Sequence, residues 1–189
     1  QHITKIGWHG HNDCGLSLAN SIAAIKAGVD FISGAFAGIG ERAGNTPLEQ
    51  VILFLYKSGN HNYNLEKIID YCEKLAIYTN HTISDSFPII GKQAFATCTG
   101  THTNAVLKAK EKGIDFEDYV FSSVPASKFG KEQNIYINFN SGLSNAIYVL
   151  ENLGISNSEK NAQKVLEYAK QQSGVLQVSK IKKLVGEKL

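Results

Sequence analysis

Two histidines placed two residues apart constrain this chain more than any other feature. His9 and His11 lie in a strand-like run over residues 3–13. Side chains of a strand alternate between its two faces, so residues two apart project from the same face. Two neutral imidazoles that converge at a strand end supply half of a divalent-metal site. The alternative is a pair of histidines satisfied by neighbouring hydrogen bonds, and spacing alone leaves both open.

Composition is that of an ordinary globular protein. The chain has 189 residues, of which 43% are hydrophobic and 19% charged, with a net charge of +2, and this length allows one domain with a real core. Its lysines are scattered except for Lys180, Lys182 and Lys183, so we expect no nucleic-acid partner. Because no apolar run approaches the ~20 residues that cross a bilayer, we expect no membrane partner.

The cysteines indicate a reducing compartment. There are three, far apart and without C-x-x-C spacing: Cys14, Cys72 and Cys98. This pattern argues against a disulfide framework and against a thiolate zinc site, so we expect a cytoplasmic protein. Cys72 falls on a helical apolar stripe, where we expect a small buried side chain.

The first 60 residues alternate between strand and helix patterns. A helical stripe that ends at Gly28 follows the first strand, then come a second buried strand over 29–36 and a glycine loop over 37–45. Thr46 to Glu49 has the form of a capping box, with Pro47 at the first helical position. The predicted stripe consists of Leu16, Ala19, Ala23 and Ala27. The order predicts two β/α units of a parallel α/β sheet.

Two units cannot close a sheet or cover both of its faces. The chain also has no methionine and begins on Gln1, directly before the first strand. We therefore expect an interior piece, the carboxyl-terminal part of a longer protein whose amino-terminal half supplies the missing strands.

The pattern changes near residues 80–90. Before that point, a helix carries an apolar face of Leu65, Ile68, Ile69, Cys72, Leu75 and Ala76. After it we expect a loop over 87–102, a helix to about 112, a loop over 124–130 and a strand over 135–139. Helices over 142–153, after Ser158 and around 181–185 complete the prediction. Residues 1–85 thus form a parallel α/β body, and residues 86–189 a small, mostly helical accessory region.

The imidazoles and the glycine loop both follow strands, so we expect them on one rim, where α/β barrels build their active sites. There, Asn45 offers a carboxamide near a metal. Glu41 and Arg42 supply charge, and we expect both to bind the substrate. Taken alone, the loop is equally a turn. It is not a dinucleotide fingerprint, because Gly38-Ile-Gly40 lacks the third glycine.

Several motifs in series resemble one enzyme superfamily. They are His9-Gly-His-Asn-Asp13, Ala19-Asn-Ser-Ile-Ala-Ala24, Gly38-Ile-Gly-Glu-Arg-Ala-Gly-Asn-Thr46, Gly91-Lys-Gln-Ala-Phe95, Gly100-Thr-His102, Val124-Pro-Ala-Ser-Lys-Phe-Gly130 and Ser141-Gly-Leu-Ser-Asn145. Over residues 3–155 the chain resembles the metal-dependent superfamily of 2-isopropylmalate synthase, homocitrate synthase and HMG-CoA lyase, in particular the carboxyl-terminal portion of a short-form 2-isopropylmalate synthase. The resemblance implies the last two β/α units of a TIM barrel in 1–85, and accessory lid or dimerisation subdomains in 86–189.

The resemblance also implies roles for individual residues. His9 and His11 match ligands of a divalent ion (Mg, Mn or Zn), and Asn45 matches an asparagine beside it. His102 matches a histidine that assists proton transfer. The family's catalytic tyrosine falls at Phe121, and we expect Tyr119, two residues before it, to take that catalytic role. The family's remaining carboxylate ligand and its arginine lie on early strands that this chain lacks.

The implied activity is condensation of acetyl-CoA with a 2-oxo acid by a cytoplasmic homodimer, as in leucine biosynthesis. Citramalate or homocitrate synthesis is an alternative. So is a 4-hydroxy-2-oxovalerate aldolase, which shares Gly-x-His-Gly-His but not Glu41-Arg42. A third possibility is an inactive fragment that only dimerises. Two histidines and an amide lack an anionic ligand, so we expect weak metal affinity and no turnover from the 189 residues alone.

Overall fold

The computed structural model describes residues 4–186, so Ile3, where the predicted first strand begins, lies outside the described residues. Among these residues the chain divides into two compact units. Unit 1 holds residues 4–94 together with 128–130, and unit 2 holds 95–127 together with 131–186. The assignment of 1–85 to a barrel and of 86–189 to an accessory region remains a prediction.

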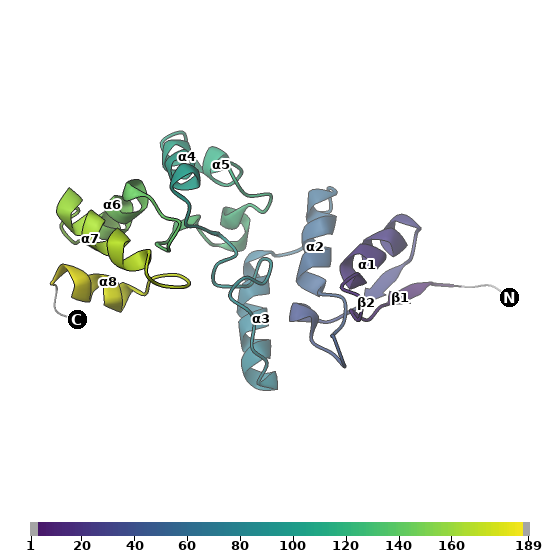
Figure 1. The fold of residues 1–189 in the computed structure, drawn as a ribbon. Coiled ribbons are helices and arrows are strands. Elements are labelled where there is room, and N and C mark those ends of the chain that lie inside the picture. Colours follow the sequence, from purple (N-terminus) through teal and green to yellow (C-terminus); the bar gives the residue numbers. More distant parts are fainter. Residues whose placement is uncertain (1–3, 187–189) are drawn as a thin grey trace. The chain divides into compact units, whose positions relative to one another are not determined.

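The described part of unit 1 alternates strands and helices. Its elements are β1 (Gly7–His9), α1 (Ser17–Lys26), β2 (Phe31–Ser33), the 3-10 turn η1 (Phe36–Gly38), α2 (Leu48–Lys57) and α3 (Glu66–Thr79). β1 pairs with β2 in parallel, and α1 packs alongside this pair and against α2 (Figure 1). This is a mixed α/β arrangement, as predicted. Each strand has three residues, fewer than predicted, because the two pair only over that length.

α1 forms where the helical stripe predicted a helix, but the stripe is not the buried face of this helix. Leu16 is 54% exposed, and Ala19, Ala23 and Ala27 are also exposed. The helix buries Ser17 and Ser21 instead. Ser21 Oγ accepts a hydrogen bond from Trp8 Nε1 at 3.1 Å and lies 2.8 Å from Thr46 Oγ1. Hydroxyl groups with tertiary hydrogen-bond partners therefore face inward, which apolar periodicity does not detect.

The predicted capping box at the start of α2 is also wrong. Pro47 is the N-cap residue, and no side chain caps the helix. The Thr46 backbone N–H donates to the Gly10 carbonyl at 3.2 Å. Glu49 accepts the Ala37 N–H through Oε2 at 2.9 Å. Both side chains are fully buried, so tertiary hydrogen bonds have replaced the local ones that a capping box requires.

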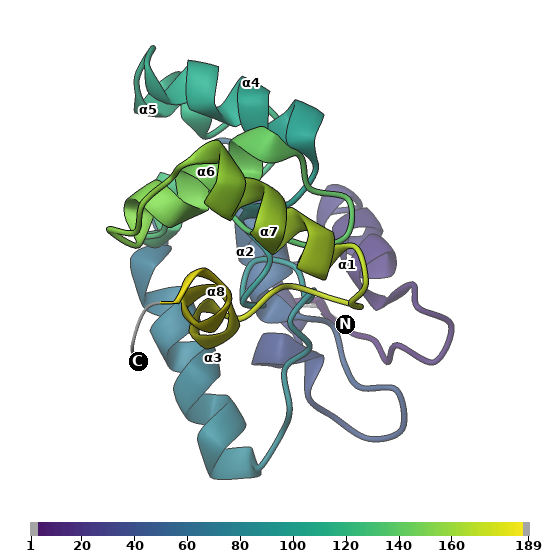
Figure 2. The same cartoon turned by 60° about the vertical axis from the view of Figure 1, so that its left-hand side comes forward.

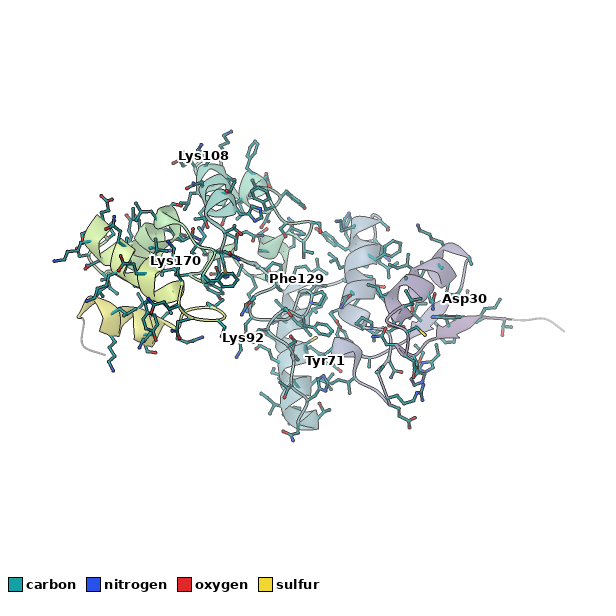
Figure 3. All side chains as sticks on the ribbon, in the orientation of Figure 1. Asp30, Tyr71, Lys92, Lys108, Phe129 and Lys170 are labelled. Atoms are coloured by element: carbon teal, nitrogen blue, oxygen red, sulfur yellow. The ribbon has the colours of Figure 1, made fainter. Side chains whose placement is uncertain are left out.

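The prediction for α3 is confirmed over the first half of its apolar face, whereas Leu75 and Ala76 are only half-buried. Leu65, Ile68, Ile69 and Cys72 are all buried. On another side of the helix, the Tyr71 ring, labelled in Figure 3, lies 4.7 Å from the Phe36 ring of η1. This contact joins α3 to the turn from which the glycine loop begins.

Unit 2 is mostly helical. Its elements are β3 (Ala96–Thr97), α4 (Gly100–Lys110), α5 (Ile114–Glu117), β4 (Asn134–Ile135), α6 (Leu143–Asn152), α7 (Glu159–Ala169) and α8 (Val178–Val185), and the turn η2 (Ala126–Phe129) is shared with unit 1. β3 and β4 pair in parallel. β4 has two residues where a strand over 135–139 was predicted.

One apolar cluster holds the last three helices together. Figure 2 shows α6 beside α7, with α8 against α7. The buried members of the cluster are Ile137, Ala146, Leu150, Ile155, Ala162, Val165, Leu166, Ala169 and Ile181. Ser158 caps α7 as predicted, accepting the Asn161 N–H. No helix among residues 4–186 is long and apolar enough to span a membrane.

The thiols give a direct test of this fold. Cys72 is fully buried, and this burial raises its pKa to about 12. At pH 8 only about one Cys72 in ten thousand would carry a thiolate. Ellman's reagent should therefore modify exposed Cys14 rapidly and leave Cys72 unmodified until the chain unfolds. Cys14→Ser should abolish the rapid phase and Cys72→Ser should not; a rapid phase that disappears in Cys72→Ser would contradict the fold of α3.

Candidate metal and acyl-transfer site

The imidazoles of His9 and His11 meet at their Nε2 atoms. His9 is the last residue of β1, and His11 forms an isolated antiparallel bridge with Asn45 of the glycine loop. The two Nε2 atoms are 3.3 Å apart, and the rings are nearly perpendicular, with centroids 5.0 Å apart. His9 is exposed and His11 half-buried, so the point where they meet is open to a ligand.

Ser33 orients the His9 ring. β-sheet register places Ser33 opposite His9, and His9 Nδ1 lies 3.2 Å from the Ser33 carbonyl oxygen and 3.3 Å from Ser33 Oγ. In the tautomer that carries the proton on Nδ1, this nitrogen donates to the Ser33 carbonyl oxygen, which only accepts. The Nε2 lone pair of His9 is then free to bind a ligand, as in metal sites where a carbonyl fixes the histidine tautomer.

The distance between the imidazoles fits a shared metal ion. Two nitrogens that each lie about 2.1 Å from one ion are about 3.0 Å apart at a right angle and about 3.4 Å apart at a tetrahedral angle. The observed 3.3 Å falls within this interval. The described residues contain no group of three or more His, Cys, Asp or Glu placed to hold a metal. The pair therefore fits two positions of a site that needs further ligands.

The glycine loop, residues 37–45, fits closely around Asn45. Asn45 Nδ2 donates to the Ile39 carbonyl at 3.1 Å, while its Oδ1 is buried and unpartnered among the described residues. A Cβ at Gly40 would lie 2.4 Å from Asn45 Nδ2, and one at Gly44, where φ is +88°, would lie 2.1 Å from the Gly38 carbonyl oxygen. Glycine is therefore required at both positions if Asn45 is to lie beside His11.

Arg42 and Glu41 differ in their surroundings. Arg42 forms a bidentate pair with Asp13, at 2.7 Å from Nε and 3.1 Å from Nη2, and this pairing lowers the pKa of Asp13. Glu41 is 86% exposed and lies 3.8 Å from Arg42 Nη1. Sequence reasoning did not single out Asp13. The opposite charges of Asp13 and Arg42, each in a recognised motif, were a signal, but their separation of 29 residues along the chain concealed the contact.

His102 lies in the first turn of α4, in unit 2. Asn145 holds this turn by donating to the Cys98 carbonyl at 2.9 Å and to Thr103 Oγ1 at 2.6 Å. Ser141 Oγ also donates to the Cys98 carbonyl, at 2.6 Å. The motif Ser141–Asn145 is thus hydrogen-bonded to residues on both sides of the motif Gly100–His102. Its exposed ring stacks on the Phe121 ring, with centroids 4.1 Å apart.

Tyr119, the other predicted catalytic residue of unit 2, is 56% exposed. It lines a groove of about 370 Å³ together with Lys108, Lys112 and Phe116. The structure therefore brings His102 together with Phe121, the position to which the family's tyrosine was aligned, and places Tyr119 in this groove.

Comparison with known proteins defines the class. The HMGL-like family model matches residues 1–75, which include both imidazoles and the whole glycine loop. Together with the relatives described next, this match confirms the predicted resemblance. Residues 1–75 thus match the HMGL-like family, and the chain is similar to homocitrate synthases and 2-isopropylmalate synthases.

Three relatives illustrate the similarity. The homocitrate synthase of Pyrococcus horikoshii is 36% identical over 152 residues, which cover 80% of this chain and 40% of that protein. The 2-isopropylmalate synthase of Buchnera aphidicola from Acyrthosiphon pisum is 33% identical, covering 85% of this chain and 30% of that protein. 2-Isopropylmalate synthase 2 of Caldanaerobacter subterraneus is 29% identical, covering 88% and 42%. The chain spans well under half the length of these curated relatives.

Glu49 links the glycine loop to the pH dependence of stability. It anchors Ala37, whose φ is +57°, and its burial raises its pKa above the ordinary 4.5. A carboxyl with a raised pKa in the folded state stabilises the fold fully below pH 4.5, and this contribution is lost as pH rises through the folded-state pKa.

We therefore expect the free energy of unfolding of unit 1 to fall as pH rises above about 4.5, and to fall less in Glu49→Gln. Urea denaturation between pH 4 and 8, followed by fluorescence of Trp8, the only tryptophan, measures this. Glu73→Gln, on the exposed side of α3, is the control and should match the wild type. An identical pH profile for Glu49→Gln would show that the carboxyl does not titrate in this way.

Proposed function

We propose that the full-length protein is an acyltransferase that condenses acetyl-CoA with a 2-oxo acid. The observation that carries this proposal is the imidazole pair, with Nε2 atoms 3.3 Å apart beside the glycine loop, in a chain whose relatives are homocitrate and 2-isopropylmalate synthases. In this proposal residues 1–85 supply the last two β/α units of a TIM barrel. Residues 86–189 supply accessory subdomains, and the enzyme acts as a cytoplasmic homodimer.

Three residues would hold the divalent ion in this proposal. His9 and His11 would bind it through Nε2, and Asn45 would lie beside it, with the remaining ligands supplied from outside this chain. When bound, such an ion would polarise the ketone of the 2-oxo acid as a Lewis acid. The Ser33 carbonyl would keep His9 in the tautomer that leaves Nε2 free, and Asn45 Oδ1, unpartnered among the described residues, would accept a hydrogen bond from a ligand.

The condensation also needs proton transfer. A base must remove a methyl proton of acetyl-CoA before the new carbon–carbon bond forms, and the resulting alkoxide must be protonated. Water must then hydrolyse the thioester of this adduct, so that CoA leaves as a free thiol. We propose that His102 moves one of these protons. Its ring is exposed, and its stacking on Phe121 restricts ring rotation. Tyr119 is the second proposed acid–base group, since its phenol is exposed.

For the 2-oxo acid we propose 2-oxoisovalerate, which makes the enzyme a 2-isopropylmalate synthase. The motifs of the accessory region support this choice, and so does the similarity to 2-isopropylmalate synthases of Buchnera and Caldanaerobacter. The alternative is 2-oxoglutarate, which would make it a homocitrate synthase. The similarity to Pyrococcus homocitrate synthases favours this alternative.

One assay tests the class and the substrate together. The full-length protein is incubated with acetyl-CoA, with Mg²⁺, Mn²⁺ or Zn²⁺, and with 2-oxoisovalerate, 2-oxoglutarate or pyruvate in separate reactions. Release of free CoA thiol that depends on a 2-oxo acid supports the proposed class of acyltransferase. The 2-oxo acid that gives the fastest thiol release identifies the substrate. If none of the three acids releases thiol above the rate without 2-oxo acid, the proposed function is wrong.

The imidazole pair should be essential in this assay. His9→Ala or His11→Ala should lower kcat/KM by at least about a hundredfold, because each removes a ligand of the ion that polarises the ketone. The matched control is His81→Ala, at an exposed position that follows α3, which should leave kcat/KM within about twofold. A His9 or His11 variant as active as the His81 variant would remove the pair from the mechanism.

A further inference from the structure

The chain uses arginine at a single position. Of its 19 basic Lys and Arg residues, Arg42 is the only arginine. Lysine presents one compact ammonium, whereas arginine presents a planar fork that binds a carboxylate through two parallel hydrogen bonds. At Arg42 the fork is used in this way, because Nε and Nη2 contact the two different oxygens of Asp13 at 2.7 and 3.1 Å.

Arg42 also has an unusual backbone conformation. Its φ is +56°, in the left-handed region that disfavours side chains with a Cβ. A residue keeps such an unfavourable backbone conformation only where surrounding interactions hold it in place. The bidentate pair with Asp13 is the interaction that the Arg42 side chain makes at this point, so it offsets the unfavourable backbone conformation.

The pair connects the two segments that form the site. Asp13 follows His11 by two residues, and Arg42 precedes Asn45 by three. The Asn12 N–H donates to the Gly44 carbonyl at 2.8 Å, and His11 bridges Asn45. The Asp13–Arg42 pair therefore joins the same two segments as this backbone hydrogen bond and the bridge that places Asn45 beside His11.

Asp13 uses the guanidinium edge that carries Nε and Nη2. Nη1 on the other side lies 3.8 Å from the Glu41 carboxylate. A substrate carboxylate that bound Arg42 through Nε and Nη2 would have to displace Asp13. This arrangement differs from the substrate-binding role predicted for Arg42 from sequence.

We propose that Asp13 and Arg42 are positioning residues for the reaction: their bidentate pair fixes the glycine loop against the His11 segment, so that Asn45 lies beside the imidazoles. The predicted effects on kcat and KM rest on the proposed function. The predicted effect on the structure of the glycine loop does not. Arg42 acts through Asp13, and neither residue takes the substrate carboxylate.

Kinetics of four variants of the full-length protein distinguish positioning from substrate binding. Asp13→Asn, Arg42→Lys and Arg42→Gln each break the bidentate geometry, and the fourth variant combines Asp13→Asn with Arg42→Gln. Positioning predicts that each single change lowers kcat by about tenfold and leaves KM for the 2-oxo acid within about twofold. The double variant should be no slower than the worse single one, because both changes remove the same interaction. Asp70→Asn, exposed on α3, is the control.

Substrate binding predicts a different pattern. Arg42→Gln would raise KM for the 2-oxo acid by about tenfold or more, whereas Asp13→Asn would not raise it. That pattern would overturn the proposal, and so would additive losses in the double variant.

A second measurement does not need activity. Amide hydrogen exchange should become at least about tenfold faster at Asn12 and Asn45 in Asp13→Asn and Arg42→Lys, because these N–H groups donate across the glycine loop and the loop would open more often. Exchange at Val51 in α2 should stay unchanged. Amide exchange at Asn12 and Asn45 should rise less in Arg42→Gly than in Arg42→Ala, because glycine accepts the positive φ at this position. Unchanged exchange at Asn12 and Asn45 would overturn the proposal even if the enzyme is active, and faster exchange would support it even if no synthase activity is found.

Discussion

The register between β1 and β2 is the constraint on which the site depends. Parallel pairing sets His9 opposite Ser33, and this brings the Ser33 carbonyl to His9 Nδ1. With Nδ1 beside Ser33, the Nε2 of His9 lies 3.3 Å from the Nε2 of His11, two residues later in the chain. A shift of one residue would move His9 to the other face of the strand pair. The imidazole pair, the neighbouring glycine loop and the proposed metal chemistry therefore follow from a pairing of three residues on each strand.

Local periodicity predicted those parts of the fold that apolar burial decides. The two-residue period of a strand placed the imidazoles on one face, and α3 buries Ile68, Ile69 and Cys72, where the helical period put them. Apolar periodicity failed at α1, where Ser17 and Ser21 are buried in place of the alanines. It failed because the Ser21 hydroxyl finds its hydrogen-bond partners in Trp8 and Thr46, which are distant in sequence.

The same limit applies to the candidate site. The histidines and Asn45 could be identified from their spacing and from the resemblance, because each belongs to a short motif. The partners that hold them could not. Glu49 had the appearance of a capping residue but anchors Ala37, and Asp13 pairs with Arg42 across 29 residues. Short motifs show which groups can react, and long-range hydrogen bonds determine which of them are brought together.

The central claim is that His9 and His11 bind one divalent ion through their Nε2 atoms. X-ray absorption spectroscopy of the full-length protein loaded with one equivalent of Zn²⁺ tests it most directly. The account predicts imidazole scattering from two histidines with nitrogens at about 2.0–2.1 Å, and loss of one of the two in His9→Ala. A first shell of oxygen atoms alone, or a spectrum that is identical in wild type and His9→Ala, would contradict it.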